Sequence, residues 1–437
     1  MIRQFWLVLL IFIPIIPKVE VLSLGGVSIL LDDFCLFAAA LLGVVGVLLK
    51  ASIRGSLRVS YFQVTSLLGL FVLYKTVNFA VLSLIYPWTD LSGIGKGVLF
   101  SEGILVLAKT GIFFVVFYLF SSEIRSIKAV ETVLRLFMVS IIAVVGVGLV
   151  QYIILEHPIL TSTFRNIHAL SQRTAVWGLE DPWFDASATG HEQLGAFMII
   201  AISLLGGLLL NRKTDDTRWK LVLLLGGCIF VLILASSRGA WIGATCSLLV
   251  FIWLSVKRNN LSGLLVLGGF ICCGLYVLEF VFDVSLIDYV YSRTRDLIPI
   301  GSGEVKDNSA VLRLITFKIL WGAFENSMLI GWGAGGAGRI AEGQYIRELV
   351  EGGLIGITIW VYLIAKSSQV TMATYRLSAD PRIKGVCIGF FCGLVGLCGQ
   401  ALFTELLVIT KVAVPFWILA AIVHRYYSLE LQEKRTQ

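Results

Sequence analysis

Hydrophobic residues form long runs that recur along the whole chain. About twelve runs of roughly 20 residues can be drawn, near residues 4–24, 34–49, 61–85, 99–120, 129–154, 191–210, 219–235, 239–256, 262–281, 345–365, 384–403 and 406–424. The short alternating segments of a β-barrel are absent, and backbone amides inside a bilayer must bond within a helix. The pattern therefore predicts an all-α, polytopic integral membrane protein with about 12 transmembrane helices, forming a single membrane domain over residues 1–437.

The composition agrees with this pattern. Of the 437 residues, 57% are hydrophobic and only 14% are charged, whereas a soluble protein carries about 25% charged residues. So high an apolar content also excludes intrinsic disorder. The eight cysteines lie inside or at the start of apolar runs and lack the spacing of zinc ligands. We interpret them as small hydrophobic residues, and the sequence predicts no metal and no other cofactor.

Lysines and arginines are distributed unevenly among the connections between the runs. If the N-terminus is cytoplasmic, the basic clusters near 50–58, 125–128, 212–218, 257–258, 366–384 and 425–435 all fall inside. The short outside connections then hold only Lys18, Lys96 and Arg238. This asymmetry is the positive-inside pattern, and it predicts that both termini are cytoplasmic. The net charge of +7 is therefore a topology signal, and nucleic acid is not an expected partner.

Two connections are long, and both fall on the predicted outer face: residues 155–190 and 282–344. The first is rich in ionisable residues and tryptophans, and Arg173 is among its cations. Such a surface suits an anionic lipid-linked sugar, although interfacial tryptophans also serve as membrane anchors. His191 follows this loop at the start of a span, where it either contacts substrate or caps the helix with Thr189.

A very short turn with an arginine joins two spans at Ser236-Ser237-Arg238-Gly239. An arginine at membrane depth is costly unless it is paired. Its guanidinium grips phosphate oxygens in a bidentate way that lysine does not match. Arg238 is thus a candidate phosphate ligand, and the alternative is an arginine that reaches to the lipid headgroups.

The second long loop contains a segment with helical periodicity that begins at Arg313. Leu314, Phe317 and Trp321 form an apolar stripe, with Arg313 lying off it. This arrangement is typical of a short helix that rests on the membrane surface. Five glycines follow within residues 331–338 and predict tight backbone turns. A nucleotide-binding interpretation of these glycines is weak because no strand precedes them.

Residues 342–356 begin at the outer face and are predicted to enter the membrane as a helix. Helical spacing places Glu342 and Tyr345 on one face, which makes Tyr345 a candidate substrate-binding residue. Carboxylates in the first turn suit the helix dipole, which is the structural interpretation of Glu342 and Glu348. The catalytic alternative is that one of them accepts a proton from an attacking sugar hydroxyl.

These motifs in this order resemble those of the O-antigen ligase/polymerase superfamily of bacterial envelope enzymes. The segments that carry the resemblance are SSRGAW at 236–241, RLITFKILWGAF at 313–324, LIGWGAGG at 329–336 and EGQYIRELVEGGLIG at 342–356. The resemblance is strongest over residues 165–365. It implies an inverting, metal-independent glycosyltransferase of the membrane GT-C type, which takes an undecaprenyl-diphosphate-linked glycan as donor at the periplasmic face. Arg173 and Arg238 match the arginines that hold the diphosphate, and Arg313 matches the arginine that opens the surface helix.

One departure from the family pattern affects the expected reaction. Ligases typically place a histidine where this chain has Glu342, although the spacing to Gly353 and Gly356 is retained. A glutamate is a weaker base than a histidine at neutral pH. The departure favours a polymerase of lipid-linked repeat units of O-antigen, capsule or exopolysaccharide, located in the bacterial inner membrane. A flippase and a chain-length regulator are its expected partners, besides the lipid bilayer.

Two alternatives to the polymerase remain open at the sequence level. The first is an O-antigen ligase that transfers finished glycan to lipid A core or to protein. The second is a transporter, in which Lys75, Glu102 and Lys109 inside the third and fourth spans would line a path. We prefer to interpret these three residues as buried ion pairs, for instance between Lys75 and Glu102. Glu405, between the last two spans, is interpreted as an outer-edge carboxylate, and the alternative is a contact with substrate.

Overall fold

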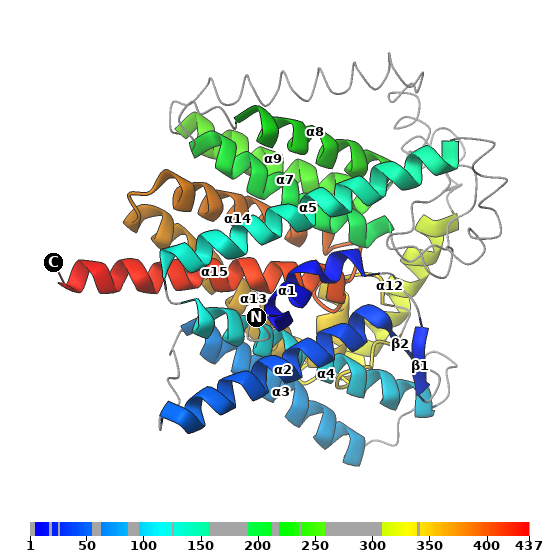
Figure 1. Ribbon diagram of the computed structural model, residues 1–437. Helices are drawn as coiled ribbons and strands as arrows, with labels where there is room; N and C mark the ends of the chain where they lie inside the picture. The colour runs from blue at the N-terminus through cyan, green and yellow to red at the C-terminus, as the bar shows by residue number, and fades with distance from the viewer. Residues whose placement is uncertain are drawn as a thin grey trace.

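The computed structural model describes residues 5–16, 20–24, 27–54, 63–85, 96–124, 126–156, 191–211, 218–235, 237–257, 308–338 and 341–436. Nearly all of this structure is helical (Figure 1). The helices are α1 (Phe5–Phe12), α2 (Leu31–Arg54), α3 (Gln63–Ile85), α4 (Lys96–Glu123), α5 (Ile127–Glu156), α7 (His191–Asn211), α8 (Arg218–Leu234), α9 (Arg238–Lys257), α12 (Asn308–Asn326), α13 (Gln344–Leu377), α14 (Pro381–Gln400) and α15 (Thr410–Thr436). A 3-10 turn, η2 (Ile13–Ile15), follows α1. The strands β1 (Glu20–Leu24) and β2 (Val27–Leu30) form a small antiparallel hairpin.

Nine helices in the described part of the chain are long and apolar enough to cross a membrane. This finding confirms the prediction of a helical, polytopic membrane protein. The helix α8 agrees with a predicted span but has only 17 residues, and the predicted span 262–281 lies outside the described residues. The total of twelve spans therefore stays a prediction.

The first predicted span is wrong as a continuous helix over 4–24. The chain forms the eight-residue helix α1, then η2, and then enters β1. Pro14 lies in η2 and Pro17 follows it. Proline lacks the backbone N–H and clashes with the preceding turn, so it ends the helix here before a full crossing.

The helix α13 is longer than predicted. The sequence places a span at 345–365 and a basic connection after it, whereas the helix continues through 34 residues to Leu377. Within it, Gly353 has a non-helical backbone with a φ of 63°. The helix is therefore interrupted near its first third, and Arg376 lies in its last turn.

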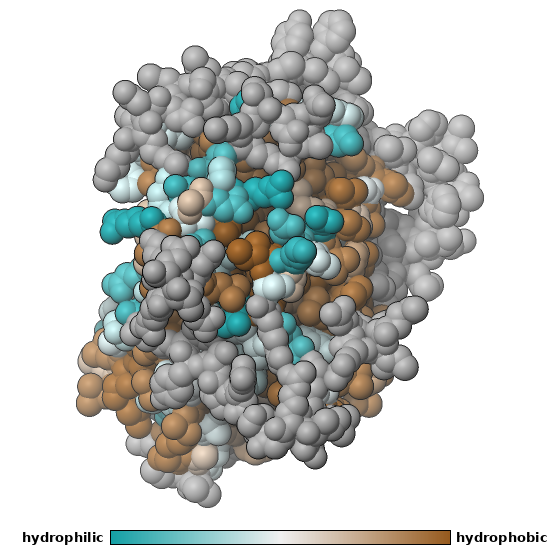
Figure 2. All heavy atoms as spheres, turned by 60° about the vertical axis from the view of Figure 1, so that its left-hand side comes forward, coloured by the Kyte–Doolittle hydropathy of each residue, from teal (hydrophilic) through white to brown (hydrophobic). Residues whose placement is uncertain are grey.

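The bundle has two distinct ends. At one end α13 and α15 begin, α14 ends and α12 packs against α13; we call this the α12 end, and it lies on the right in Figure 1. The C-terminus lies at the opposite end. Figure 2 turns that opposite side forward and shows hydrophilic side chains gathered across its middle, with hydrophobic side chains to the right and below. Arg376 and Arg382, which flank the α13–α14 connection, are exposed.

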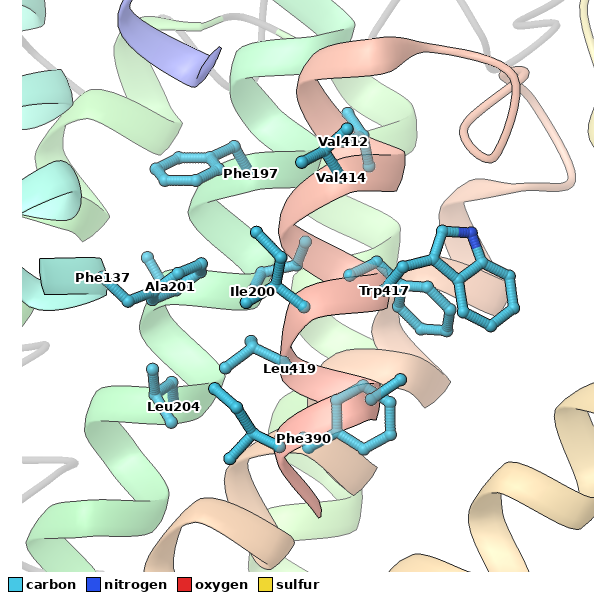
Figure 3. Close-up of a cluster of buried hydrophobic side chains, with 14 of the residues drawn as sticks. Phe137, Phe197, Ile200, Ala201, Leu204, Phe390, Val412, Val414, Trp417 and Leu419 are labelled. Atoms are coloured by element: carbon cyan, nitrogen blue, oxygen red, sulfur yellow. The ribbon is translucent and has the colours of Figure 1, made fainter. Parts of the chain in front are cut away.

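The helices α7, α14 and α15 form the centre of the bundle. Their buried side chains include Phe197, Phe390 and Trp417, which belong to the buried hydrophobic cluster shown in Figure 3. The backbones of α7 and α14 touch, because a Cβ added to Gly207 would lie 2.2 Å from the carbonyl oxygen of Gly385. Small residues allow such close packing of helices in membranes.

The outer helices keep large apolar side chains on their surface. Examples are Leu41 of α2, Leu73 of α3 and Ile142 of α5, each more than half exposed. A surface of this kind is costly in water but not against lipid tails. The outer surface therefore agrees with a membrane protein whose central helices are shielded from lipid.

Candidate active site at the α12 end

The predicted site residues His191, Arg238, Arg313, Glu342 and Tyr345 all belong to segments at the α12 end. His191 is the first residue of α7 and Arg238 the first of α9. Arg313 lies in α12, Glu342 lies just before α13, and Tyr345 lies in the first turn of α13. The sixth predicted residue, Arg173, lies outside the described residues.

Arg313 holds two carboxylates that come from distant parts of the chain. Its Nε lies 2.6 Å from Glu342 Oε2, and its Nη2 lies 3.2 Å from Glu192 Oε1 in α7. All three side chains are partly exposed, by 31%, 49% and 28% respectively. Exposed ion pairs contribute little stability, so phosphate oxygens could replace either carboxylate on this guanidinium. We call Glu192, Arg313 and Glu342 the exposed trio.

Arg238 begins α9 beside the connection between α14 and α15. Ser237 is buried, and its Oγ accepts a hydrogen bond from the backbone N–H of Ala240 at 3.3 Å. A Cβ added to Gly239 would lie 3.4 Å from Phe403 Cβ and 3.7 Å from Thr404 Oγ1. The small residue after Arg238 thus lets the start of α9 approach this connection closely.

Residues 401–409, which we call the 401–409 turn, tie these segments together. The backbone N–H of Gln344 donates to the carbonyl oxygen of Ala401 at 2.9 Å. In return, Gln344 Oε1 accepts hydrogen bonds from the N–H groups of Leu406 and Leu407, each at 3.1 Å. Gln400, the last residue of α14, immediately precedes the turn. Its Nε2 donates to the carbonyl oxygen of Glu192 in α7 at 2.9 Å. The starts of α7, α9 and α13 therefore meet at one turn.

The structure does not place Glu342 and Tyr345 on one helical face. The helix α13 begins at Gln344 with Gly343 as its N-cap, so Glu342 precedes the helix and helical spacing does not apply to it. The hydroxyl of Tyr345 donates to the carbonyl oxygen of Cys398 at 3.0 Å, and its ring packs edge-on against Trp360. Tyr345 therefore joins α13 to α14, and its role in substrate binding stays a prediction.

A second group of charged side chains lies deeper at the same end. Lys75 Nζ lies 2.9 Å from Glu348 and 3.2 Å from Glu351. Arg347 Nε lies 2.9 Å from Glu351, and its other nitrogens contact Glu405 and Glu102, the latter at 3.5 Å. We call this group the buried cluster; its members are Lys75, Glu102, Arg347, Glu348, Glu351 and Glu405.

The sequence correctly predicts that charged residues inside the spans form ion pairs, but it assigns the wrong partners. Lys75 pairs with α13 and not with Glu102, and Glu102 pairs with Arg347. Lys109 lies 2.9 Å from Asp33 of α2. These partners come from segments far apart in sequence, so spacing along the chain could not reveal them.

Glu405 lies in the 401–409 turn, in the connection between the last two spans where the sequence places it. Its side chain is only 16% exposed and contacts Arg347. Burial raises the pKa of Glu405 to about 7, with Arg347 acting to lower it and Glu351 and Glu102 acting to raise it. The only signal in the sequence was a single acidic residue between two apolar runs.

The glycine-rich segment after α12 supports the interrupted part of α13. Gly331, Gly333, Gly335 and Gly338 all have positive φ, which confirms the predicted tight turns. The N–H of Trp332 donates to the carbonyl oxygen of Val350 at 2.7 Å. This segment thus satisfies backbone groups that the break at Gly353 leaves without helical partners, as a membrane environment requires.

In the part of the chain that the structure describes, no group of three or more His, Cys, Asp or Glu side chains is placed to hold a metal ion. The polar groups at the α12 end are instead guanidinium groups, carboxylates and backbone N–H groups. Guanidinium groups bind phosphate and carboxylate oxygens, and carboxylates exchange protons with hydroxyls. The arrangement therefore suits an anionic, hydroxyl-bearing ligand.

Residues 221–361 match a family model described as O-Antigen ligase, which confirms the resemblance predicted from the motifs. A search of curated proteins found none that match. The matched stretch contains Arg238, Arg313, Glu342 and Tyr345, while His191 and Glu405 lie outside it. The match covers 141 of the 437 residues and supports an enzyme function of the O-antigen ligase/polymerase type in a membrane protein.

Proposed function

We propose that this protein is an inverting glycosyltransferase that takes an undecaprenyl-diphosphate-linked glycan as donor and polymerises lipid-linked repeat units. The product would be an O-antigen, capsule or exopolysaccharide, made at the periplasmic face of the bacterial inner membrane. The observation that supports the proposal is that Arg238 and Arg313 belong to segments at the same end of the bundle. Gln400 links them, because it bonds to Glu192, the partner of Arg313, and packs beside Gly239.

In the proposed reaction a sugar hydroxyl of one repeat unit attacks the anomeric carbon of the donor. The bond from this carbon to the diphosphate breaks, and the leaving diphosphate gains negative charge. Fixed guanidinium groups stabilise that charge most in the transition state, which accelerates the reaction. Arg313 would exchange its contact with Glu342 for the phosphate oxygens, so Glu342 keeps the arginine in place until the donor binds.

The ligase is the second candidate function, since the matching family model carries that description. Glu342, in place of the histidine typical of ligases, favours the polymerase. A deletion strain separates the two: loss of a polymerase leaves single repeat units, whereas loss of a ligase leaves long chains that are not attached. The transporter alternative loses support, because Lys75, Glu102 and Lys109 form ion pairs with other helices.

The direct test is transfer by the purified protein in proteoliposomes that contain undecaprenyl-diphosphate-linked oligosaccharide. We expect the wild type to lengthen the lipid-linked glycan, and Arg238→Ala to lower kcat by about 100-fold or more. Lys366→Ala, which removes a cation from the far part of α13, serves as the control and should retain full activity. Polymerisation by Arg238→Ala at the wild-type rate would contradict the proposal.

A further inference from the structure

We propose that Glu405 is the proton acceptor of the transfer reaction. It takes the proton that the attacking sugar hydroxyl releases, and the buried cluster holds its carboxylate in position. This inference rests on the proposed function, because it concerns the same reaction at the same end of the bundle. It differs from the sequence-based prediction, in which Glu342 is the candidate base.

Glu405 lies on a turn that contacts the segments carrying Arg238 and Glu342, the partner of Arg313. Its neighbour Thr404 packs against Gly239, the residue after Arg238. On its other side, the N–H of Leu406 donates to Gln344, which lies two residues after Glu342. Glu405 therefore lies on the turn that connects the starts of α9 and α13.

Access distinguishes Glu405 from the other carboxylates of the buried cluster. The side chains of Glu348 and Glu351 are 2% and 0% exposed, so a substrate cannot reach them. Glu405 retains 16% exposure and Glu102 retains 12%. Glu102 lies within a spanning helix, α4, whereas Glu405 lies in a connection at the α12 end. Of the four carboxylates, Glu405 is thus the best placed to meet a hydroxyl from the surface.

The charge balance of the buried cluster gives Glu405 the capacity to take up a proton. Four carboxylates share two cations. Arg347 and Glu351 of α13 and Glu102 of α4 face Glu405, and Lys75 of α3 is engaged by Glu348 and Glu351. Because Arg347 divides its charge among three carboxylates at largely buried positions, a negative Glu405 is only partly neutralised. A base is most effective when its pKa is close to the working pH.

The proton transfer balances with the glycosyl transfer. The hydroxyl oxygen forms a bond to the anomeric carbon as its proton passes to a carboxylate oxygen of Glu405. The bond between the anomeric carbon and the diphosphate oxygen breaks, and its electron pair leaves with the diphosphate. Glu405 then gives the proton to water, which restores the starting state.

Glu342 is less suited to this step. Its carboxylate contacts the Arg313 guanidinium at 2.6 Å and is half exposed, so water and one arginine neutralise its charge. Once Arg313 binds the diphosphate, Glu342 lies beside the leaving group. When the diphosphate departs, Glu342 binds the Arg313 guanidinium again. It therefore provides a matched control: a glutamate at the same end of the bundle that also pairs with an arginine.

The test is the pH profile of kcat in proteoliposomes containing lipid-linked oligosaccharide. We expect the wild-type rate to fall as pH decreases through about 7, because only the deprotonated form of Glu405 accepts a proton. Glu405→Gln should lower kcat by about 100-fold and abolish this acid limb, with an unchanged KM for the donor. Glu405→Asp should keep the limb, shifted to lower pH, with kcat reduced by about 10-fold. Glu342→Gln should retain the limb.

Several outcomes would overturn the inference. One is an acid limb and a kcat in Glu405→Gln that match the wild type, and another is loss of the limb in Glu342→Gln instead. If Glu405→Gln does not yield a folded protein, Glu405→Asp decides, since an unchanged profile in this charge-conserving variant also overturns the inference. A wild type without any transfer activity would count against the proposed function and not against the choice of Glu405.

Discussion

The exposed trio and the buried cluster lie at the same end of the bundle and use the same chemistry in opposite ways. In the trio, Arg313 holds Glu192 and Glu342 at partly exposed positions that water reaches. In the buried cluster, Arg347 is 4% exposed and binds carboxylates from α13, α4 and the 401–409 turn. The comparison shows that burial, and not the type of residue, decides whether an ion pair can exchange partners.

The energetic consequences of the two environments differ widely. An exposed pair contributes up to about 1 kcal/mol, because water and salt compete for both charges. Removal of one partner from a buried pair costs about 3–5 kcal/mol, because the other charge is left without compensation. The exposed trio is thus free to respond to a ligand, whereas the buried cluster fixes the helices on which the site is built.

We expect the largest effect from Lys75→Met in the buried cluster. The change leaves Glu348 and Glu351 without their shared cation and should lower the free energy of unfolding by about 4 kcal/mol. Thermal unfolding of the detergent-solubilised protein, followed by tryptophan fluorescence, measures this loss. Lys318→Met, at an exposed position of α12, is the matched control and should unfold like the wild type. Equal stability of the two variants would remove the distinction between buried and exposed charges.

A slightly smaller effect is expected from Gly353→Ala, at the break beside the buried cluster. The φ of 63° disfavours any residue with a Cβ, and the new Cβ would lie 2.4 Å from the backbone of Leu329. Together these costs should amount to about 3 kcal/mol of unfolding free energy. Gly111→Ala in α4, where an added Cβ meets nothing within 4 Å, should leave the same unfolding transition unchanged.

Arg313→Ala should separate activity from stability. Loss of this guanidinium from the exposed trio should reduce kcat by about 100-fold, or about 2.7 kcal/mol. The free energy of unfolding should change by less than about 1 kcal/mol, because the pairs it breaks are partly exposed. Arg313→Lys keeps the charge but not the two-pronged geometry, and should recover part of the activity. An inactive Arg313→Ala that also unfolds early would place Arg313 with the structural residues.

The two clusters also show what the sequence could and could not predict. Long apolar runs predicted the spans of α2, α3, α4, α5, α7, α9, α14 and α15 because helix formation in a bilayer depends on local hydrophobicity. The length of the first helix was predicted wrongly, because Pro14 ends the helix although the run around it is hydrophobic. The glycines around 331–338 predicted turns correctly because positive φ is a local property of glycine.

Contacts between segments that lie far apart in the chain could not be predicted from the sequence. Motif order singled out Arg238, Arg313 and Glu342, and the structure places them in segments at one end of the bundle, while their roles stay predictions. The contacts of Lys75 with Glu348 and Glu351 join α3 to α13, and the contact of Arg347 with Glu102 joins α13 to α4. Only the pair of Arg347 with Glu351, four residues apart on one helix, follows from local spacing. The burial of Glu405 depends on its contact with α13 and on α4, so its environment could not be predicted from the residues around position 405.

The smallest effect is expected from Arg382→Ala, which removes an ion pair between an arginine and a glutamate at the opposite end. Arg382 Nη1 lies 3.2 Å from Glu131 Oε1, the same distance as Arg313 Nη2 from Glu192, but the side chain is 59% exposed. Water and salt should screen this pair, so the free energy of unfolding should change by less than about 0.5 kcal/mol. Glycosyl transfer should stay at the wild-type rate, because Arg382 lies far along the chain and bundle from the arginines that would meet the donor. If Arg382→Ala lost as much activity as Arg313→Ala, the importance of Arg313 could not be explained by its location at the α12 end.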